Sequence, residues 1–250
     1  MCLSAEVSFA AAAILVPTGV VSTYKAARTD WRYVPICALP FLFGVQQLFE
    51  GLVWTSGEAG DLTAISRYSL AYMFFSWLAW PVWVPMAVWF LEPVRRKPLY
   101  LGFVILGAIF GGGQYLPYAV HQEWLTVTFL PHAIAYGGIE LFDFLLAREW
   151  TYSIYVLAVV VPLLVASRPE IRVFGVLVAT VLAITYLFFR FAYVSAFCFG
   201  GALVSIYLVG MIFWKGRRSA QGRELERGED AIASDPAGSA TAHAPGDLPR

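Results

Sequence analysis

The sequence predicts an all-α integral membrane protein: a bundle of seven transmembrane helices with its N-terminus outside and its C-terminus in the cytoplasm. Of the 250 residues, 59% are hydrophobic and 14% are charged, whereas soluble domains of this size are less apolar. Apolar runs of about the 20 residues that a membrane-spanning helix needs alternate with short polar connections. The lipid bilayer is therefore the expected partner. The formal net charge is zero, so no basic surface suggests a nucleic-acid partner.

Seven apolar runs form the expected spans of one transmembrane domain over residues 1–215. No basic segment precedes the first run, and no small-residue cleavage site with a soluble domain follows it. We therefore interpret this run as a span rather than a signal peptide. The expected spans are Val7–Tyr24, Val34–Trp54, Leu70–Leu91, Leu99–Val120, Thr151–Ala166, Val173–Phe189 and Tyr193–Trp214.

The distribution of basic residues predicts the orientation, because Lys and Arg gather in cytoplasmic connections. Three alternate connections and the segment after the last span hold Lys25, Arg28, Arg32, Arg95, Arg96, Lys97, Arg168, Arg172, Lys215, Arg217 and Arg218. The opposite side holds Arg67, Arg148 and Arg190. This bias predicts an outer N-terminus and a cytoplasmic C-terminus, in agreement with an odd number of spans.

Two segments lie outside the expected spans. Residues 121–150 form a long outer connection, in which the stretch GIELFDFLLAREW places Glu140 and Asp143 opposite a leucine face. This pattern predicts an amphipathic helix lying at the membrane interface. Residues 216–250 are polar, small and proline-bearing, a composition that predicts a disordered cytoplasmic tail.

The second span carries a polar stripe, GVQQLFEGLVW. Gln46, Glu50 and Trp54 follow one another at intervals of four residues and so share a helix face, with Gln47 beside them. A carboxyl group inside a membrane is costly and indicates a functional site, although an ion pair with Arg190 would be a structural alternative. The candidate ligand-binding residues are Gln46, Gln47, Glu50, Trp54, Arg190 and Tyr136.

Two of the three cysteines fall on the outer side, together with a histidine of the long connection. Three interpretations of Cys2, His132 and Cys198 stay open. Cys2 and Cys198 can form a disulfide in an oxidising compartment. Alternatively, the three residues bind zinc or copper as the cofactor, near Glu50. In the third interpretation the cysteines are independent and unreactive, which agrees with the absence of CxxC and HxxxH spacing.

Several stretches together resemble an uncharacterised bacterial multi-pass membrane family: MCLSAEVSF, GVQQLFEGLVW, LEP at residues 91–93, HAIAY from His132, and SAFCF. Members of that family typically begin Met-Cys-Phe-Ser-Ala and carry Gln-Leu-x-Glu in the second helix. This chain departs at Leu3 and Phe197, where the family favours Phe and Trp, and has Pro131 where a second His is common. The resemblance covers residues 1–210, and it implies a bacterial inner-membrane protein without implying an activity.

Three functions remain open, and binding ranks first. In the first, an outward-facing polar pocket around Glu50 and Gln47 binds or senses a small ligand or metal. In the second, a membrane-embedded enzyme acts on a terpenoid or lipid-like substrate with Glu50 as general acid, because burial favours a neutral carboxyl group. The chain is similar in length and span count to small seven-span membrane terpene cyclases, although its late spans lack their second acid. The third is a proton-coupled transporter.

Overall fold

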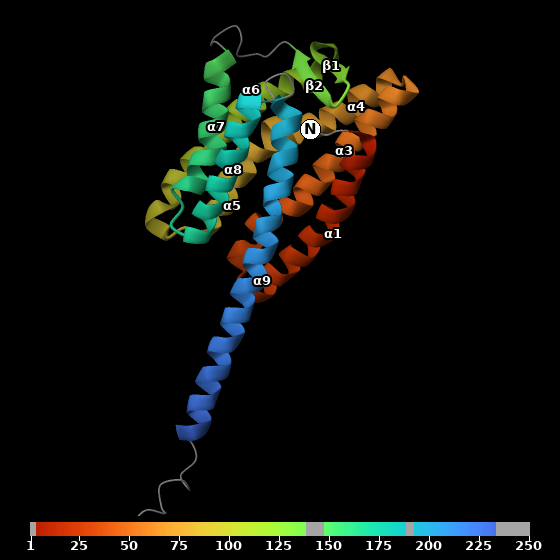
Figure 1. The fold of residues 1–250 in the computed structure, drawn as a ribbon. Coiled ribbons are helices and arrows are strands. Elements are labelled where there is room, and N and C mark those ends of the chain that lie inside the picture. Colours follow the sequence, from red (N-terminus) through yellow and green to blue (C-terminus); the bar gives the residue numbers. More distant parts are fainter. Residues whose placement is uncertain (1–3, 139–147, 189–192, 234–250) are drawn as a thin grey trace, which may run out of the picture.

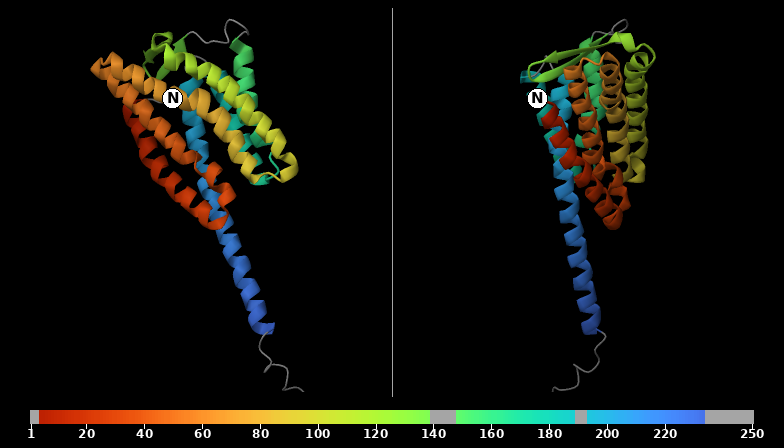
Figure 2. Two further views of the ribbon diagram at one scale, coloured as in Figure 1. Left: turned by 180° about the vertical axis from the view of Figure 1, so that it is seen from behind. Right: turned by 90° about the vertical axis from the view of Figure 1, so that its right-hand side faces the viewer.

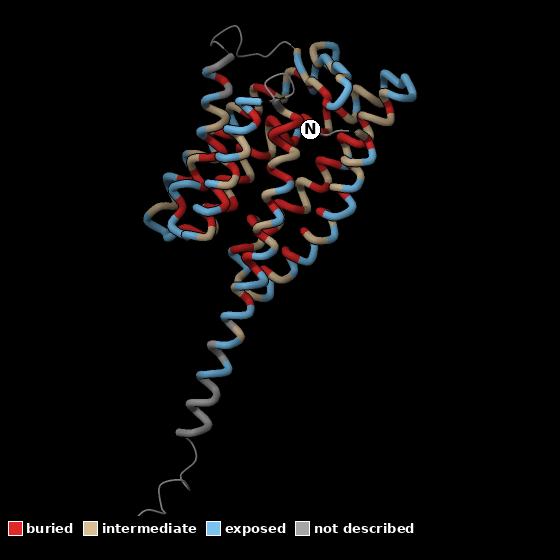
Figure 3. Tube along the Cα trace, in the orientation of Figure 1, coloured by how far each residue is buried: buried red, intermediate tan, exposed pale blue. Residues whose placement is uncertain are grey.

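The computed structural model describes residues 4–138, 148–188 and 193–233. Over these ranges the protein is a bundle of helices standing side by side, with one β-hairpin lying across an end of the bundle (Figure 1). Buried residues face the interior of the bundle, and exposed residues cover its outside (Figure 3). Large apolar side chains such as Ile14, Ile109 and Leu187 are exposed on that outer surface, as expected where lipid replaces water.

The helices and strands follow one another in a simple order. They are α1 (Ala5–Thr29), η1 (Trp31–Tyr33), α2 (Val34–Cys37), α3 (Leu39–Ala59), α4 (Leu62–Met73), the π-helix η2 (Phe74–Ala79), α5 (Trp80–Leu91), η3 (Val94–Arg96), α6 (Lys97–Val120), η4 (Gln122–Trp124), β1 (Leu125–Leu130), β2 (Ala133–Gly138), α7 (Arg148–Leu164), α8 (Pro169–Phe188) and α9 (Tyr193–Ala233).

Six helical segments in the described ranges are long and apolar enough to cross a membrane. They are Ala5–Thr29, Trp31–Ala59, Leu62–Leu91, Val94–Val120, Pro169–Phe188 and Val194–Arg218. The span expected at Thr151–Ala166 corresponds to a shorter apolar helix, Ser153–Leu164 within α7. The protein is therefore a polytopic membrane protein by helix length and composition.

Local chemistry fixes the turn between α3 and α4. Gly60 ends α3 with a φ of 70°, a left-handed conformation that glycine adopts without strain. Asp61 then caps α4, and its carboxylate accepts a hydrogen bond from the Ala64 backbone N–H at 3.0 Å. This turn brings α4 against α3, which packs on its other side along α1.

The hairpin corrects the expected outer connection. The sequence predicts a loop with an interfacial helix over residues 121–150, but β1 and β2 pair antiparallel, with Leu125 opposite Gly138 and Leu130 opposite Ala133. Their sequences, LTVTFL and AIAYGG, contain β-branched and aromatic residues that favour strands. Most of the stretch expected to form that helix, residues 139–147, lies outside the described residues, and its last three residues, Arg148 to Trp150, begin α7.

Helix α9 corrects the expected start of the tail. The composition predicts disorder from residue 216, but α9 continues to Ala233 and extends well beyond the bundle (Figure 2). Residues 216–233 include four Arg, three Glu and three Ala, which have high helix propensity. Because they continue an existing helix, they avoid the cost of nucleating a new one. The remainder of the expected tail, residues 234–250, lies outside the described residues.

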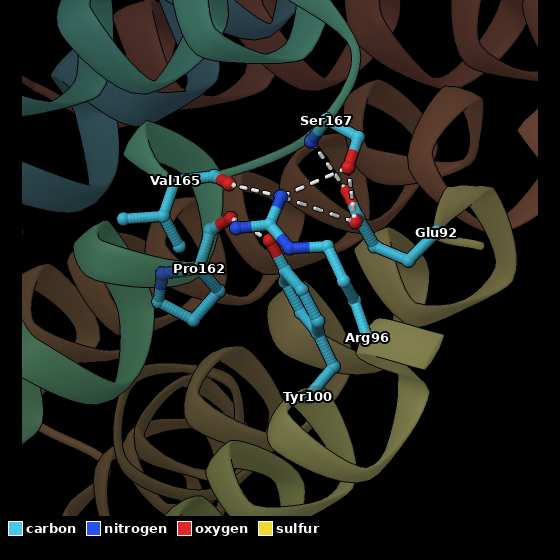
Figure 4. A network of polar contacts seen from close by, with 6 residues as sticks. All are labelled: Glu92, Arg96, Tyr100, Pro162, Val165 and Ser167. Carbon is cyan, nitrogen blue, oxygen red and sulfur yellow. Dashed lines mark hydrogen bonds and ion pairs between the residues drawn. The ribbon is translucent and has the colours of Figure 1, made fainter. Parts of the chain in front are cut away.

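A buried carboxylate ties the turn between α5 and α6 to the turn between α7 and α8 (Figure 4). Glu92, whose side chain has no exposed surface, accepts hydrogen bonds from the Ser167 backbone N–H at 2.5 Å and hydroxyl at 2.6 Å. Arg96 lies 3.5 Å from Glu92 and donates to the Val165 carbonyl at 3.0 Å. Tyr100 on α6 donates to a carbonyl oxygen of α7 at 3.2 Å. We call Glu92, Arg96 and Ser167 the Glu92 clasp.

The Glu92→Gln substitution should weaken the bundle. The glutamine side chain has one acceptor oxygen and no charge, so it cannot accept hydrogen bonds from Ser167 and also pair with Arg96. We therefore expect a loss of about 1–3 kcal/mol in the free energy of unfolding. Thermal unfolding of the purified protein in detergent measures the effect. Glu58→Gln, an exposed position at the opposite end of the bundle, is the control and should unfold as the wild type does. Equal stability of the two variants would contradict a structural role for the clasp.

Candidate functional site

The polar stripe of α3 lies inside the bundle. Gln46, Gln47 and Glu50 each have an exposed fraction of 0%. Their burial follows from the position of α3, which packs against α1, α4 and α9. An apolar interior stabilises polar side chains only when they form hydrogen bonds, so the partners of these three residues determine what the site can do.

Glu50 is hydrogen-bonded to the start of α9. The Ser195 hydroxyl donates to Glu50 Oε1 at 2.6 Å, and Gln47 Nε2 donates to Glu50 Oε2 at 3.2 Å. Ser195 belongs to the first turn of α9 as described. The N-terminal end of a helix carries a partial positive charge that stabilises a nearby carboxylate. Glu50 thus joins α3 to α9 in the interior of the bundle.

Gln46 joins α3 to the helix formed by η2 and α5. Its Nε2 donates to the Ser76 hydroxyl at 2.9 Å, while its Oε1 accepts from Trp80 Nε1 at 3.2 Å. The Ser76 hydroxyl also lies 3.5 Å from Cys198 Sγ on α9. Side chains from three helices therefore meet in one polar cluster. We call Gln46, Gln47, Glu50, Ser76 and Ser195 the Glu50 centre.

A π-helical turn, η2, places Ser76 in this centre. Pro81 follows it, and a proline cannot donate the regular helical hydrogen bond to the carbonyl four residues earlier, here that of Trp77. Tyr155 on α7 donates to the Ser76 carbonyl at 2.6 Å. On α6, a Cβ at Gly111 would lie 2.5 Å from the Trp77 carbonyl oxygen, so only glycine allows this close approach. Single π-turns within α-helices are frequent at functional sites.

The hairpin covers the end of the bundle above the centre. Tyr136 of β2 stacks on Tyr72 of α4, with ring centroids 4.9 Å apart and an angle of 19° between the rings. Phe129 of β1 lies 5.8 Å from Trp54, one turn beyond Glu50 on α3. Tyr72 and Cys198 belong to one small buried cluster, against which Tyr136 packs. The Glu50 centre is therefore enclosed by helices at its sides and bordered by the hairpin at one end.

A family model described as a family of unknown function, DUF6629, matches residues 1–225. The chain belongs to this family. The expected membership of an uncharacterised family is thus confirmed, and the match extends over the whole bundle and the first part of the α9 extension. No curated protein and no solved structure matches the chain.

The predicted ligand-binding residues of this DUF6629 protein fall into two groups. Gln46, Gln47 and Glu50 lie together in the Glu50 centre, whereas Trp54 and Tyr136 lie toward the hairpin and contact Phe129 and Tyr72. Arg190, the expected ion-pair partner, lies outside the described residues.

Sequence reasoning missed Ser76 and Ser195 as members of the Glu50 centre, and Trp80 as a hydrogen-bond donor to Gln46. Ser76 stands as a lone hydroxyl within the aromatic run FFSWLAW, five residues before Pro81. A polar residue next to a proline within a span could have suggested an irregular, hydrogen-bonded turn. No comparable feature marks Ser195, whose role depends entirely on how α9 packs against α3.

The residues of the predicted metal or disulfide site stand in different surroundings. His132 is exposed at the turn of the hairpin. Cys198 is a free thiol, only 2% exposed, beside Ser76. Cys2, common to both interpretations, lies outside the described residues. Within the described ranges no three His, Cys, Asp or Glu residues are grouped closely enough to hold a metal ion.

Ser76→Ala should destabilise this DUF6629 protein more than Ser69→Ala. Both serines are buried on the same continuous helix. Removing the Ser76 hydroxyl leaves the Gln46 amide without an acceptor, which we expect to lower the free energy of unfolding by about 1–2 kcal/mol.

The Ser69 hydroxyl has no hydrogen-bond partner among the described residues, so its loss should be neutral or slightly stabilising. Equilibrium unfolding in mixed micelles measures both variants. If Ser76→Ala costs no more than Ser69→Ala, the hydrogen bond to Gln46 does not stabilise the bundle.

Proposed function

We propose that this DUF6629 protein binds or senses a small ligand at the Glu50 centre, inside its membrane-spanning bundle. The observation that carries the proposal is the carboxyl group of Glu50, which has no exposed surface and lies in a helix apolar enough to cross a membrane. Ionisable residues are rare at such depth and mark binding sites or ion pathways far more often than exposed charges do.

The chemistry of the centre favours a ligand that donates hydrogen bonds or carries positive charge. Glu50 offers carboxyl oxygens, and the side-chain amides of Gln46 and Gln47 offer further oxygens and N–H groups. A proton, a metal cation or a small organic ammonium ion would each reduce the cost of keeping a carboxylate in an apolar interior. A large lipophilic molecule would gain little from these groups.

Two alternatives use the same carboxyl group. One is an enzyme acting on a terpenoid or lipid-like substrate with Glu50 as general acid, and the other is a proton-coupled transporter. We rank binding or sensing first because it requires only the carboxyl group and the hydrogen-bonding side chains beside it. The enzyme requires an apolar substrate cavity in addition, and the transporter requires access to Glu50 from both membrane faces.

We also propose a topology for the bundle. Seven crossings, with Ser153–Leu164 as the shortest, would place the start of α1 and the hairpin outside the cell membrane and the α9 extension in the cytoplasm. Eleven basic residues at the end from which α9 emerges support this orientation, because cytoplasmic connections are enriched in Lys and Arg.

Labelling with dicyclohexylcarbodiimide tests the binding site. This apolar reagent partitions into membranes and adds to protonated carboxyl groups. We expect mass spectrometry of the reconstituted protein to find the reagent on Glu50, and we expect Glu50→Gln to remove the label. Glu92, held by Arg96 and Ser167, should stay unlabelled and serves as the internal control.

Competition then identifies the class of ligand. Zn²⁺ and tetramethylammonium are the probes, and a cation that occupies the centre should protect Glu50 from the reagent. Labelling of Glu50 only after denaturation would contradict the proposal, because it would mean that the centre is closed to small molecules and serves packing alone.

A further inference from the structure

Positive charge is concentrated at the end of the bundle from which α9 emerges. The four chain segments at this end, residues 24–33, 91–97, 165–172 and 213–218, contain eleven basic and three acidic residues. In the described residues at the opposite end, the acidic residues are Glu6, Glu58, Asp61, Glu123 and Glu149, and the basic residues are Arg67 and Arg148. The two ends of the bundle therefore differ in the sign of their charge.

The three acids at the basic end already have basic partners. Asp30 lies 3.6 Å from Arg32, Glu92 lies 3.5 Å from Arg96, and Glu170 lies 3.4 Å from Lys215. Eight further basic residues of these four segments remain beyond these pairs. Six of the eight are exposed, namely Arg28, Arg95, Arg168, Arg172, Arg217 and Arg218. This exposed positive charge would attract an anionic partner.

Aromatic rings place these charges at the depth of lipid headgroups. Several basic groups at this end lie over aromatic rings, among them Arg218 over Trp214 at 3.9 Å, Lys97 over Trp89 at 4.1 Å, and Arg28 over Tyr24 at 5.4 Å. Trp and Tyr side chains favour the membrane interface, with the ring near the acyl chains and the polar group toward water. A cation held against such a ring would therefore lie near the lipid phosphates.

The corner between α1 and α9 concentrates this arrangement. The two helices touch there, because a Cβ at Gly216 would lie 2.7 Å from Lys25 Cε. Arg28 leaves the last turn of α1, while Arg217 and Arg218 follow Gly216 on α9, and all three side chains are exposed. The corner thus offers several guanidinium groups, which bind phosphate through paired N–H donors.

We propose that the basic end of this protein binds the headgroups of anionic phospholipids, with Arg28, Arg217 and Arg218 as the principal contacts. The basic residues surround the helix ends of the bundle, whereas residues 219–233 of α9 contain two basic and four acidic residues. The anion is therefore recognised at the helix ends, where lipid phosphate would lie. A polybasic surface in this position is attracted to an anionic leaflet and is weakened by salt. This proposal is independent of the Glu50 centre.

Lipid retention tests the proposal. The full-length protein is reconstituted in vesicles of equal parts phosphatidylcholine and phosphatidylglycerol, extracted gently, and its retained lipids are quantified by mass spectrometry. We expect the ratio of phosphatidylglycerol to phosphatidylcholine among the retained lipids to be about fivefold higher than in the vesicle, the factor that corresponds to one favourable arginine contact. The triple variant Arg28→Gln, Arg217→Gln, Arg218→Gln should lose the enrichment, and high salt should reduce it.

The matched comparison uses single exposed arginines at the two ends. Arg218→Gln should reduce the enrichment, whereas Arg67→Gln, at the opposite end, should leave it unchanged. These single variants also carry the test if the triple variant fails to fold. The proposal is overturned if the wild type retains the two lipids in the proportions of the vesicle, or if Arg67→Gln and Arg218→Gln have equal effects.

Discussion

Polar side chains inside an apolar bundle must find hydrogen-bond partners within the protein, because lipid offers none. The arrangement of this bundle depends on that requirement at Gln46 and Glu50. Gln46 binds Ser76 and Trp80 on one neighbouring helix, and Glu50 binds Ser195 on another. Moving α5 or α9 away from α3 would leave buried donors and acceptors unpaired. The same contacts that could serve a ligand therefore also specify how the helices pack.

The two buried glutamates, Glu92 and Glu50, stand in different surroundings. Glu92 has an arginine and the backbone N–H of Ser167 beside it, near a helix end, so a charged and fixed carboxylate is stabilised there. Glu50 lies in mid-helix, where the Ser195 hydroxyl and the Gln47 amide donate to its carboxyl group. The proposed function is assigned to Glu50 because it lies inside a candidate span, whereas Glu92 lies at a turn between two spans.

Much of this architecture could be predicted from sequence, because hydrophobic runs and polar residues at intervals of four are local properties of the chain. They indicated the membrane helices and the polar face of α3. Lateral contacts could not be predicted, since the depth of Ser195 in a span does not show which helix it faces. The hairpin could not be predicted because its two short strands lie within a connection too short of apolar residues to be a span, and their pairing is not a local property of either strand. The continuation of α9 to Ala233 could not be predicted from composition, because composition does not show that the preceding span already provides the helix that these residues extend.

A double-mutant cycle between Glu50 and Ser195 tests most directly whether the polar centre ties α3 to α9. The free energy of unfolding in mixed micelles is measured for the wild type, Glu50→Gln, Ser195→Ala and the double variant. The 2.6 Å hydrogen bond between the two side chains predicts a coupling energy of about 0.5–2 kcal/mol. If the two single effects simply add, the hydrogen bond does not hold the two helices together, which would contradict the dependence of the bundle on its buried polar contacts.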